Sequence, residues 1–184
     1  MKKTDNGNLK QKLDLRRRFL RGLDGNLNVF DACQGSGVLW GILRAEFSIG
    51  NYWGVDKKHK AGRLKVDSKR VLQTKPIADI YDFDTYGSPW GHYEILLGYL
   101  SRPAIVFLTM GNLNQVAMNP DATGGKILAF PSRTPRVLMG KVSRILAINA
   151  WLTKPCVNGN MPIEIVEVRP TSAEGARYFA IRFG

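Results

Sequence analysis

Four aspartates each stand at the end of a short stretch that predicts a β-strand: Asp31, Asp56, Asp67 and Asp84. Carboxylates accept hydrogen bonds from hydroxyl and amino groups and attract cations. One acid at a strand end means little, because exposed loops carry aspartate in any case. The carboxyl ends of parallel strands meet at one edge of a sheet, and ligands of such sheets bind there. The four acids therefore predict a shared pocket for a polar ligand.

The first of these acids opens a glycine-containing turn, residues 31–37, with the sequence DACQGSG. Glycines at such a place let a ligand approach the backbone ahead of a helix N-terminus. A nicotinamide dinucleotide is the first competitor, but its motif requires a small residue where this chain has Trp40. Asp31 would also repel a pyrophosphate. Asp56 follows Gly37 by about 20 residues, a spacing that suits ribose hydroxyls with either cofactor. A nicotinamide-dependent oxidoreductase stays open as a minor alternative.

Three short motifs resemble those of class I S-adenosylmethionine-dependent methyltransferases. Residues 28–37, NVFDACQGSG, are similar to the first motif, residues 52–56, YWGVD, to the second, and residues 64–68, LKVDS, to the third. The resemblance implies that S-adenosylmethionine is the cofactor. It also implies which residues surround the methionine part of the cofactor: Asp31, Cys33, Gly35, Ser36 and Gly37.

The same resemblance implies contacts to the nucleoside part of the cofactor. Asp56 would accept hydrogen bonds from the ribose hydroxyls, and Asp67 would accept one from the amine of adenine. Lys57 and Ser68 would be flanking contacts. Cys33 has no histidine near it in sequence that could activate its thiol, so we expect it to line the pocket rather than to act as a nucleophile.

Residues 82–90, DFDTYGSPW, are similar to the Asp-Pro-Phe-Gly-Ser-Pro stretch of tRNA guanine dimethyltransferases. They are more loosely related to the Asp-Pro-Pro-Tyr motif of amino methyltransferases. Thr85 stands where the family has its first proline. The resemblance implies catalytic roles for Asp84 and Tyr86. It also implies a substrate-binding turn made of Gly87, Ser88 and Pro89.

Methyl transfer from a sulfonium to a nitrogen is an in-line displacement, in which alignment of the two reacting atoms provides much of the rate. Asp84 would accept an N–H of the amine, and Tyr86 would stack on a flat base. Two structural alternatives stay open: Asp84 caps the helix that begins near Pro89, and Tyr86 packs in the core. We expect Asp82 to face away from Asp84 and leave it out of the site. His59 and His92 have no partner pattern and are expected at the surface.

The elements that must position these residues alternate between strand and helix. Strands are predicted at 28–31, 52–56, 64–67, 78–84, 103–109, 161–168 and 177–183, and helices at 9–23, 38–47, 89–100 and 136–152, with a long loop at 111–135. The unbroken apolar run at 103–109 favours a buried central strand, and the last two strands are expected to be antiparallel neighbours. The order predicts an α/β, Rossmann-like three-layer methyltransferase fold, with a mostly parallel sheet and an antiparallel terminal strand. Residues 1–25 are expected to form a basic N-terminal helix packed on the core, and residues 26–184 the methyltransferase domain.

The net charge of +12 is concentrated in two stretches. Residues 1–21 hold eight Lys or Arg and two Asp, and residues 57–75 hold eight Lys or Arg and one Asp. Clustered positive charge favours an acidic partner, and phosphate backbones are the commonest one. We therefore expect a nucleic acid, RNA before DNA, with Arg17 and Arg21 among its contacts. The alternative is a solvated basic surface that binds nothing in particular.

Several function classes are excluded by composition. No apolar run approaches the ~18–20 residues of a membrane span, so we expect no membrane partner. Two cysteines are too few for a disulfide scaffold, and no metal-ligand spacing is present, so a reduced, metal-free, cytoplasmic protein is expected. The first hypothesis is an S-adenosylmethionine-dependent methyltransferase of a base nitrogen in RNA. Alternatives are methylation of DNA, protein or a small molecule, or a non-catalytic nucleic-acid-binding module, and a partner protein for target recognition is compatible with each.

Overall fold

A computed structural model of the chain describes residues 8–58, 64–85, 88–110, 148–169 and 176–184. Helices and strands alternate along the first two thirds of these residues, and two strands close the chain. The elements are α1 (Leu9–Leu20), β1 (Leu27–Asp31), α2 (Val38–Glu46), β2 (Ile49–Asp56), β3 (Leu64–Lys65), α3 (Ser68–Gln73), β4 (Ile80–Phe83), α4 (Trp90–Leu97), β5 (Ala104–Met110), β6 (Pro162–Val168) and β7 (Arg177–Phe183).

The described strands form one seven-stranded sheet in the order β3-β2-β1-β4-β5-β7-β6. The first five strands in this order pair in parallel, and β7 pairs antiparallel with both β5 and β6. The predicted mostly parallel sheet with its antiparallel terminal pair is therefore confirmed. All residues of β5 are buried, as its unbroken apolar sequence predicts for a strand covered on both faces.

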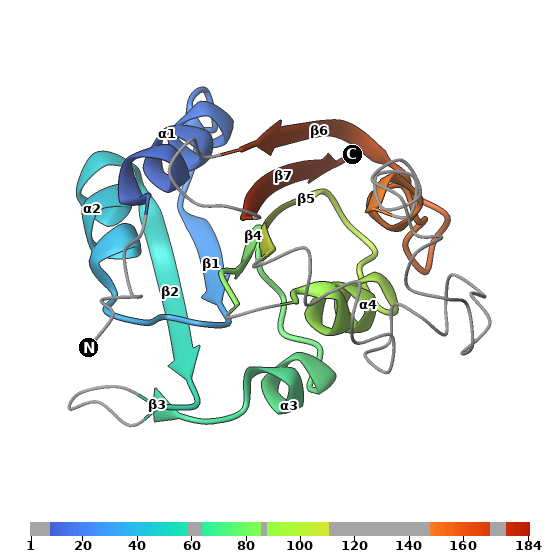
Figure 1. The fold of residues 1–184 in the computed structure, drawn as a ribbon, viewed down its shortest axis with the longest axis horizontal. Coiled ribbons are helices and arrows are strands. Elements are labelled where there is room, and N and C mark those ends of the chain that lie inside the picture. Colours follow the sequence, from blue (N-terminus) through green and yellow to red (C-terminus); the bar gives the residue numbers. More distant parts are fainter. Residues whose placement is uncertain (1–7, 59–63, 86–87, 111–147, 170–175) are drawn as a thin grey trace, which may run out of the picture.

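Helices cover both faces of the sheet, which gives the expected three layers (Figure 1). On one face, the apolar sides of α1 and α2 pack on alternate residues of the central strands, such as Ile80 and Phe107. On the other face, α3, α4 and a helical segment at 148–152 cover the intervening residues, such as Tyr81 and Val106. This alternation follows from the two-residue period of a strand.

Helix α1 is an integral part of the core. Leu13, Leu15, Phe19 and Leu20 are buried against the sheet and α2. The helix ends at Leu20, three residues before the predicted end, because Arg21 is extended and Gly22 has a φ of +76°. A left-handed glycine after the last turn is a common way to end a helix.

Helix α3 was not expected. Its N-cap is Asp67, whose side chain accepts a hydrogen bond from the backbone N–H of Lys69 at 2.9 Å. A capping acid followed by the apolar pair Val71 and Leu72 is the sequence pattern that indicates this helix. The predicted loop at 111–135 and residues 136–147 of the last predicted helix lie outside the described residues.

Candidate functional site at the carboxyl edge of the sheet

The glycine turn after β1 joins the carboxyl ends of three neighbouring strands. The backbone N–H of Ala32 donates to the carbonyl of Asp82 on β4 at 2.9 Å, and that of Gln34 donates to the carbonyl of Val55 on β2 at 3.0 Å. Gly35 and Gly37 have φ values of +54° and +74°. L side chains rarely adopt such values, so this backbone path requires glycine at both positions.

Asp56 ends β2 with its carboxylate directed at the glycine turn. One oxygen accepts the backbone N–H of Gly35 at 2.9 Å, and the other accepts that of Lys58 at 2.8 Å. An ionised carboxylate offers about four acceptor positions. The two backbone bonds therefore fix the orientation of Asp56 and leave acceptor capacity for a hydroxyl pair of a ligand.

Asp67 and Ser68 lie at the start of α3, next to the end of β2. The backbone N–H of Val66 donates to the carbonyl of Asp56 at 3.0 Å, and the ammonium of Lys57 lies 3.0 Å from the Asp67 carboxylate. The hydrogen bond from Lys57 holds the pKa of Asp67 below its usual range. The structure thus brings the nucleoside-contacting residues implied by the resemblance, including Lys57, to one place.

His92 is a buried part of this region, and the expectation that it lies at the surface is wrong. Its Nε2 is 2.8 Å from the Ser68 hydroxyl, and its ring lies 5.5 Å from that of Phe83. Burial, reinforced by the positive charge of Lys69, lowers the pKa of His92 to about 4. The imidazole is therefore neutral near pH 7. Its Nδ1 is buried without a hydrogen-bond partner among the described residues.

Asp31 ends β1 in a buried position beside the corresponding residue of β4, Asp82. Its carboxyl accepts hydrogen bonds from the Tyr52 hydroxyl at 2.7 Å and from the backbone N–H of Cys33 at 3.2 Å. Burial, followed by the negative charge of Asp82, raises the pKa of Asp31 to about 8. Burial and the Asp31 carboxylate raise the pKa of Cys33 to about 12. Cys33 is therefore a thiol at neutral pH, which supports a lining role over a nucleophilic one.

Asp82 does not face away from Asp84, and the expectation that it would is wrong. Residues two apart in a strand point to the same face, so both carboxylates face α1. Arg16 binds Asp82 through two parallel bonds of 2.7 Å, from Nε to Oδ2 and from Nη2 to Oδ1. The indole Nε1 of Trp40 donates to Oδ2 at 2.8 Å. Both partners of the ion pair are almost fully buried.

Asp84 follows the last residue of β4, and the ammonium of Lys12 lies 2.8 Å from its Oδ1 and 2.7 Å from its Oδ2. Burial alone would raise the pKa of Asp84, but the positive charges of Lys12 and Arg16 prevail and hold it below its ordinary value. The carboxylate does not cap α4, whose N-cap is Pro89 without a side-chain bond. The next residue, Thr85, has a buried hydroxyl without a partner among the described residues.

The remaining predicted substrate contacts are not all brought to Asp84. Ser88 and Pro89 lead directly into α4, whereas Tyr86 and Gly87 lie outside the described residues. Arg17 is bound to Glu46 at the end of α2 by bonds of 2.6 and 2.7 Å, and Arg21 is exposed beyond the end of α1. Both lie later in the chain than Lys12, the residue that contacts Asp84.

Sequence reasoning missed the side chains that contact the predicted site residues or the neighbouring Asp82: Lys12, Arg16, Trp40, Tyr52 and His92. A signal for Arg16 was present, because it lies on the apolar side of α1, between Leu13 and Leu20 at intervals of three and four residues. A cation on a buried helix face requires a buried anion opposite it. Ser36 has partners in the structure and stays a predicted contact of the cofactor.

The chain as a whole is similar in fold to solved methyltransferase structures. The chain has the fold of S-adenosylmethionine-dependent methyltransferases. Trm1 from Pyrococcus horikoshii, solved with S-adenosylmethionine, superposes with a TM-score of 0.62 over 96% of this chain, at 16% identity. A putative methyltransferase, yhhF, from Escherichia coli gives 0.55 over the whole chain and 90% of its own length, at 11% identity. TYW2 from M. jannaschii, solved with the same cofactor, gives 0.53 over the whole chain and 76% of its own length, at 13% identity.

The comparisons also mark limits of this likeness. The chain spans 56% of the length of Trm1. No protein-family model matches the sequence, and no curated protein matches it either. Among the described residues, no cluster of His, Cys, Asp or Glu is arranged to hold a metal ion. None of the helices in these residues has the length and apolar character required to cross a bilayer.

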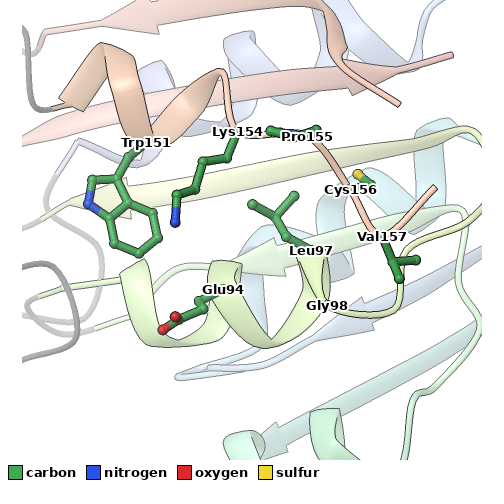
Figure 2. A pocket seen from close by; sticks show the side chains of 8 residues that line it. All are labelled: Glu94, Leu97, Gly98, Trp151, Lys154, Pro155, Cys156 and Val157. Carbon is green, nitrogen blue, oxygen red and sulfur yellow. The ribbon is translucent and has the colours of Figure 1, made fainter. Parts of the chain in front are cut away.

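A separate cavity of about 260 Å³ lies between α4 and the segment from Trp151 to Val157 (Figure 2). Glu94, Leu97 and Gly98 form one wall, and Trp151 with residues 154–157 forms the other. The ammonium of Lys154 lies 4.5 Å from the centre of the Trp151 ring. None of the strand-end aspartates lines this cavity, so it is distinct from the candidate site.

Proposed function

We propose that the chain is an S-adenosylmethionine-dependent methyltransferase that methylates a base nitrogen of a nucleic acid, RNA before DNA. The observation that carries this proposal is the position of Asp84. It is a carboxylate held in its ionised form at the same edge as the glycine turn and the oriented Asp56. The likeness of residues 82–90 to a methyltransferase reaction turn supports the choice of an amine as acceptor.

The residues at this edge fit the cofactor. Asp56 has free acceptor positions for the ribose hydroxyls, and the left-handed turn at Gly35 and Gly37 leaves the backbone without side chains at those points. When bound, the cofactor supplies a methyl group activated by a sulfonium.

Asp84 provides the acceptor function of the proposed reaction. Its carboxylate would accept an N–H of the exocyclic amine, which directs the nitrogen lone pair away from the carboxylate and toward the methyl carbon. The N–H proton becomes acidic as the nitrogen is alkylated, and the ionised carboxylate can accept it. The low pKa of Asp84 keeps this acceptor available at neutral pH.

The decisive experiment pairs binding with turnover. Calorimetry should show binding of S-adenosylmethionine and S-adenosylhomocysteine that Asp56→Ala weakens at least tenfold, because the ribose acceptor is lost. Asp24→Ala, which removes an exposed acid at the opposite edge of the sheet, should bind like the wild type. Transfer of labelled methyl groups to total RNA should fall by at least a hundredfold in Asp84→Asn, with cofactor binding nearly intact. Full turnover of Asp84→Asn would show that the reaction site lies elsewhere.

A non-catalytic nucleic-acid-binding module on the same fold is the second candidate. Lys12 occupies a position on both oxygens of Asp84, and Thr85 replaces the proline of the family turn. This alternative predicts nucleic-acid binding without transfer to any RNA, DNA or protein, even in the wild type.

A further inference from the structure

Two cations of helix α1 pair with Asp82 on β4 and with Asp84 just beyond it, and the spacing of the cations matches that of the acids. Lys12 and Arg16 are four residues apart, which is about 6 Å along a helix. Asp84 and Asp82 are two residues apart, which is about 6.6 Å along a strand. The helix runs opposite to the strand, so the earlier cation meets the later acid and both ion pairs form together.

Lys12 is held in place from several sides. Arg16 Nη1 donates to the carbonyl oxygen of Lys12 at 3.1 Å, and the Lys12 ammonium lies 5.4 Å from the centre of the Tyr178 ring. The side chain of Lys12 is only 11% exposed. Lys10, two residues earlier, is 84% exposed and pairs with Asp14 on its own helix. The two lysines therefore have different environments despite their closeness in sequence.

From this geometry we propose that Lys12 is a positioning residue of the reaction site, which orients the Asp84 carboxylate and keeps it ionised for the substrate amine. This inference rests on the proposed function, because Asp84 is the acceptor in that proposal. A carboxylate has about four acceptor positions. Lys12 takes one on each oxygen, which leaves acceptor capacity for an incoming N–H.

The ionisation of Asp84 depends on every charged or titratable group near it. These groups are Lys12 and Arg16 from α1, Asp31 from β1, Cys33 from the glycine turn and Asp82 from β4, with the hydroxyl of Thr109 on β5 as a neutral neighbour. Arg16 is already committed to Asp82 through two bonds. Lys12 is thus the cation that forms an ion pair with Asp84. Removal of Lys12 leaves Asp84 as a partly buried acid among other acids.

The test replaces Lys12 by Met, which keeps the aliphatic stem and removes the charge. Titration of the Asp84 carboxyl carbon, followed by ¹³C NMR and assigned with Asp84→Asn, should move to higher pH in Lys12→Met. Lys12→Arg should restore the wild-type titration, and Lys10→Met should leave it unchanged. An unchanged titration in a folded Lys12→Met protein would overturn the inference.

Turnover provides the second readout. We expect kcat/KM for RNA methylation to fall as the pH is lowered from about 8 to about 5.5. The fall should be about ten times larger in Lys12→Met than in the wild type, because an acid that loses a nearby cation holds its proton to higher pH. Higher turnover of Lys12→Met at all pH values would show that Lys12 blocks the site instead, and would also overturn the inference. Loss of activity in Asp84→Asn with a normal pH profile in Lys12→Met would reject this inference alone. Full activity of Asp84→Asn would reject the proposed function, whereas the carboxyl titration would still report on Lys12.

Discussion

Two buried carboxylates, Asp31 and Asp82, occupy paired positions on neighbouring parallel strands, and their partners differ in charge. Asp82 forms a two-bond ion pair with Arg16, whereas the hydrogen bonds to Asp31 come from the neutral Tyr52 hydroxyl and a backbone N–H. Burial and the charge of Asp82 therefore raise the pKa of Asp31 to about 8. The site carries one fewer negative charge near pH 7 than its acids alone would suggest.

The proton on Asp31 predicts a particular pH dependence of stability. Its pKa is 3.8 in the unfolded chain and about 8 in the folded protein. The contribution of this carboxyl to stability is therefore complete below about pH 3.8 and is lost as the pH rises through about 8. Asn cannot ionise. The free energy of unfolding of the wild type should therefore fall by about 4 kcal/mol relative to that of Asp31→Asn as the pH rises from about 5 to about 9.

Urea unfolding at both pH values measures this difference. Asp24→Asn, which changes an exposed acid, should keep a constant difference from the wild type. The same constant difference in Asp31→Asn would mean that Asp31 is ionised throughout this range.

At the scale of elements, the attachment of α1 to β4 determines the geometry of the reaction edge. Arg16 is 1% exposed, and its guanidinium also lies 4.9 Å from the centre of the Phe107 ring. Removing one partner of a buried ion pair leaves the other charge without compensation. Arg16→Met should therefore lower the free energy of unfolding by about 3–5 kcal/mol.

A double-mutant cycle separates this electrostatic cost from lost packing. Arg16→Met with Asp82→Asn should recover a substantial part of the stability, because the uncompensated charge is gone while an acceptor for Trp40 remains. Arg18→Met removes a 61% exposed arginine from the same helix and should change stability by less than about 0.5 kcal/mol. Equal losses in the single Arg16 variant and the double variant would assign the effect to packing.

The sequence predicts the helices and strands better than it predicts the contacts between them. The apolar run of β5 and the acids at the strand ends are local patterns, and local patterns predicted the sheet and the edge where the acids meet. The cationic partners of Asp82 and Asp84 come from a helix some 70 residues earlier in the chain, and no local pattern links them. The position of Asp82 was nevertheless predictable, since residues two apart in a strand share a face. The burial of His92 depends on the packing of α4 over Phe83 and Ser68, and this packing is tertiary.

At the scale of the whole molecule, part of the positive charge lies next to the candidate site. Lys65, Lys69, Arg70 and Lys75 are exposed on and around α3, whose first residues hold the predicted adenine contacts. A basic surface beside a site favours a polyanionic substrate that extends beyond the reacting base. The alternative, a merely solvated surface, predicts no specific effect of these charges on binding.

The salt dependence of RNA binding distinguishes these two explanations. Each phosphate of a single-stranded RNA that the protein contacts should add about 0.7 log units to the loss of affinity per log unit of salt. Replacing Lys69 and Arg70 by Gln should therefore reduce the slope by about 1.4, because two phosphate contacts are lost and fewer counterions are released. Lys154→Gln, at the separate cavity beside Trp151, should leave the slope unchanged. Fluorescence anisotropy at several salt concentrations measures the slope, and equal slopes in all three proteins would mean that the surface around α3 does not contact the RNA.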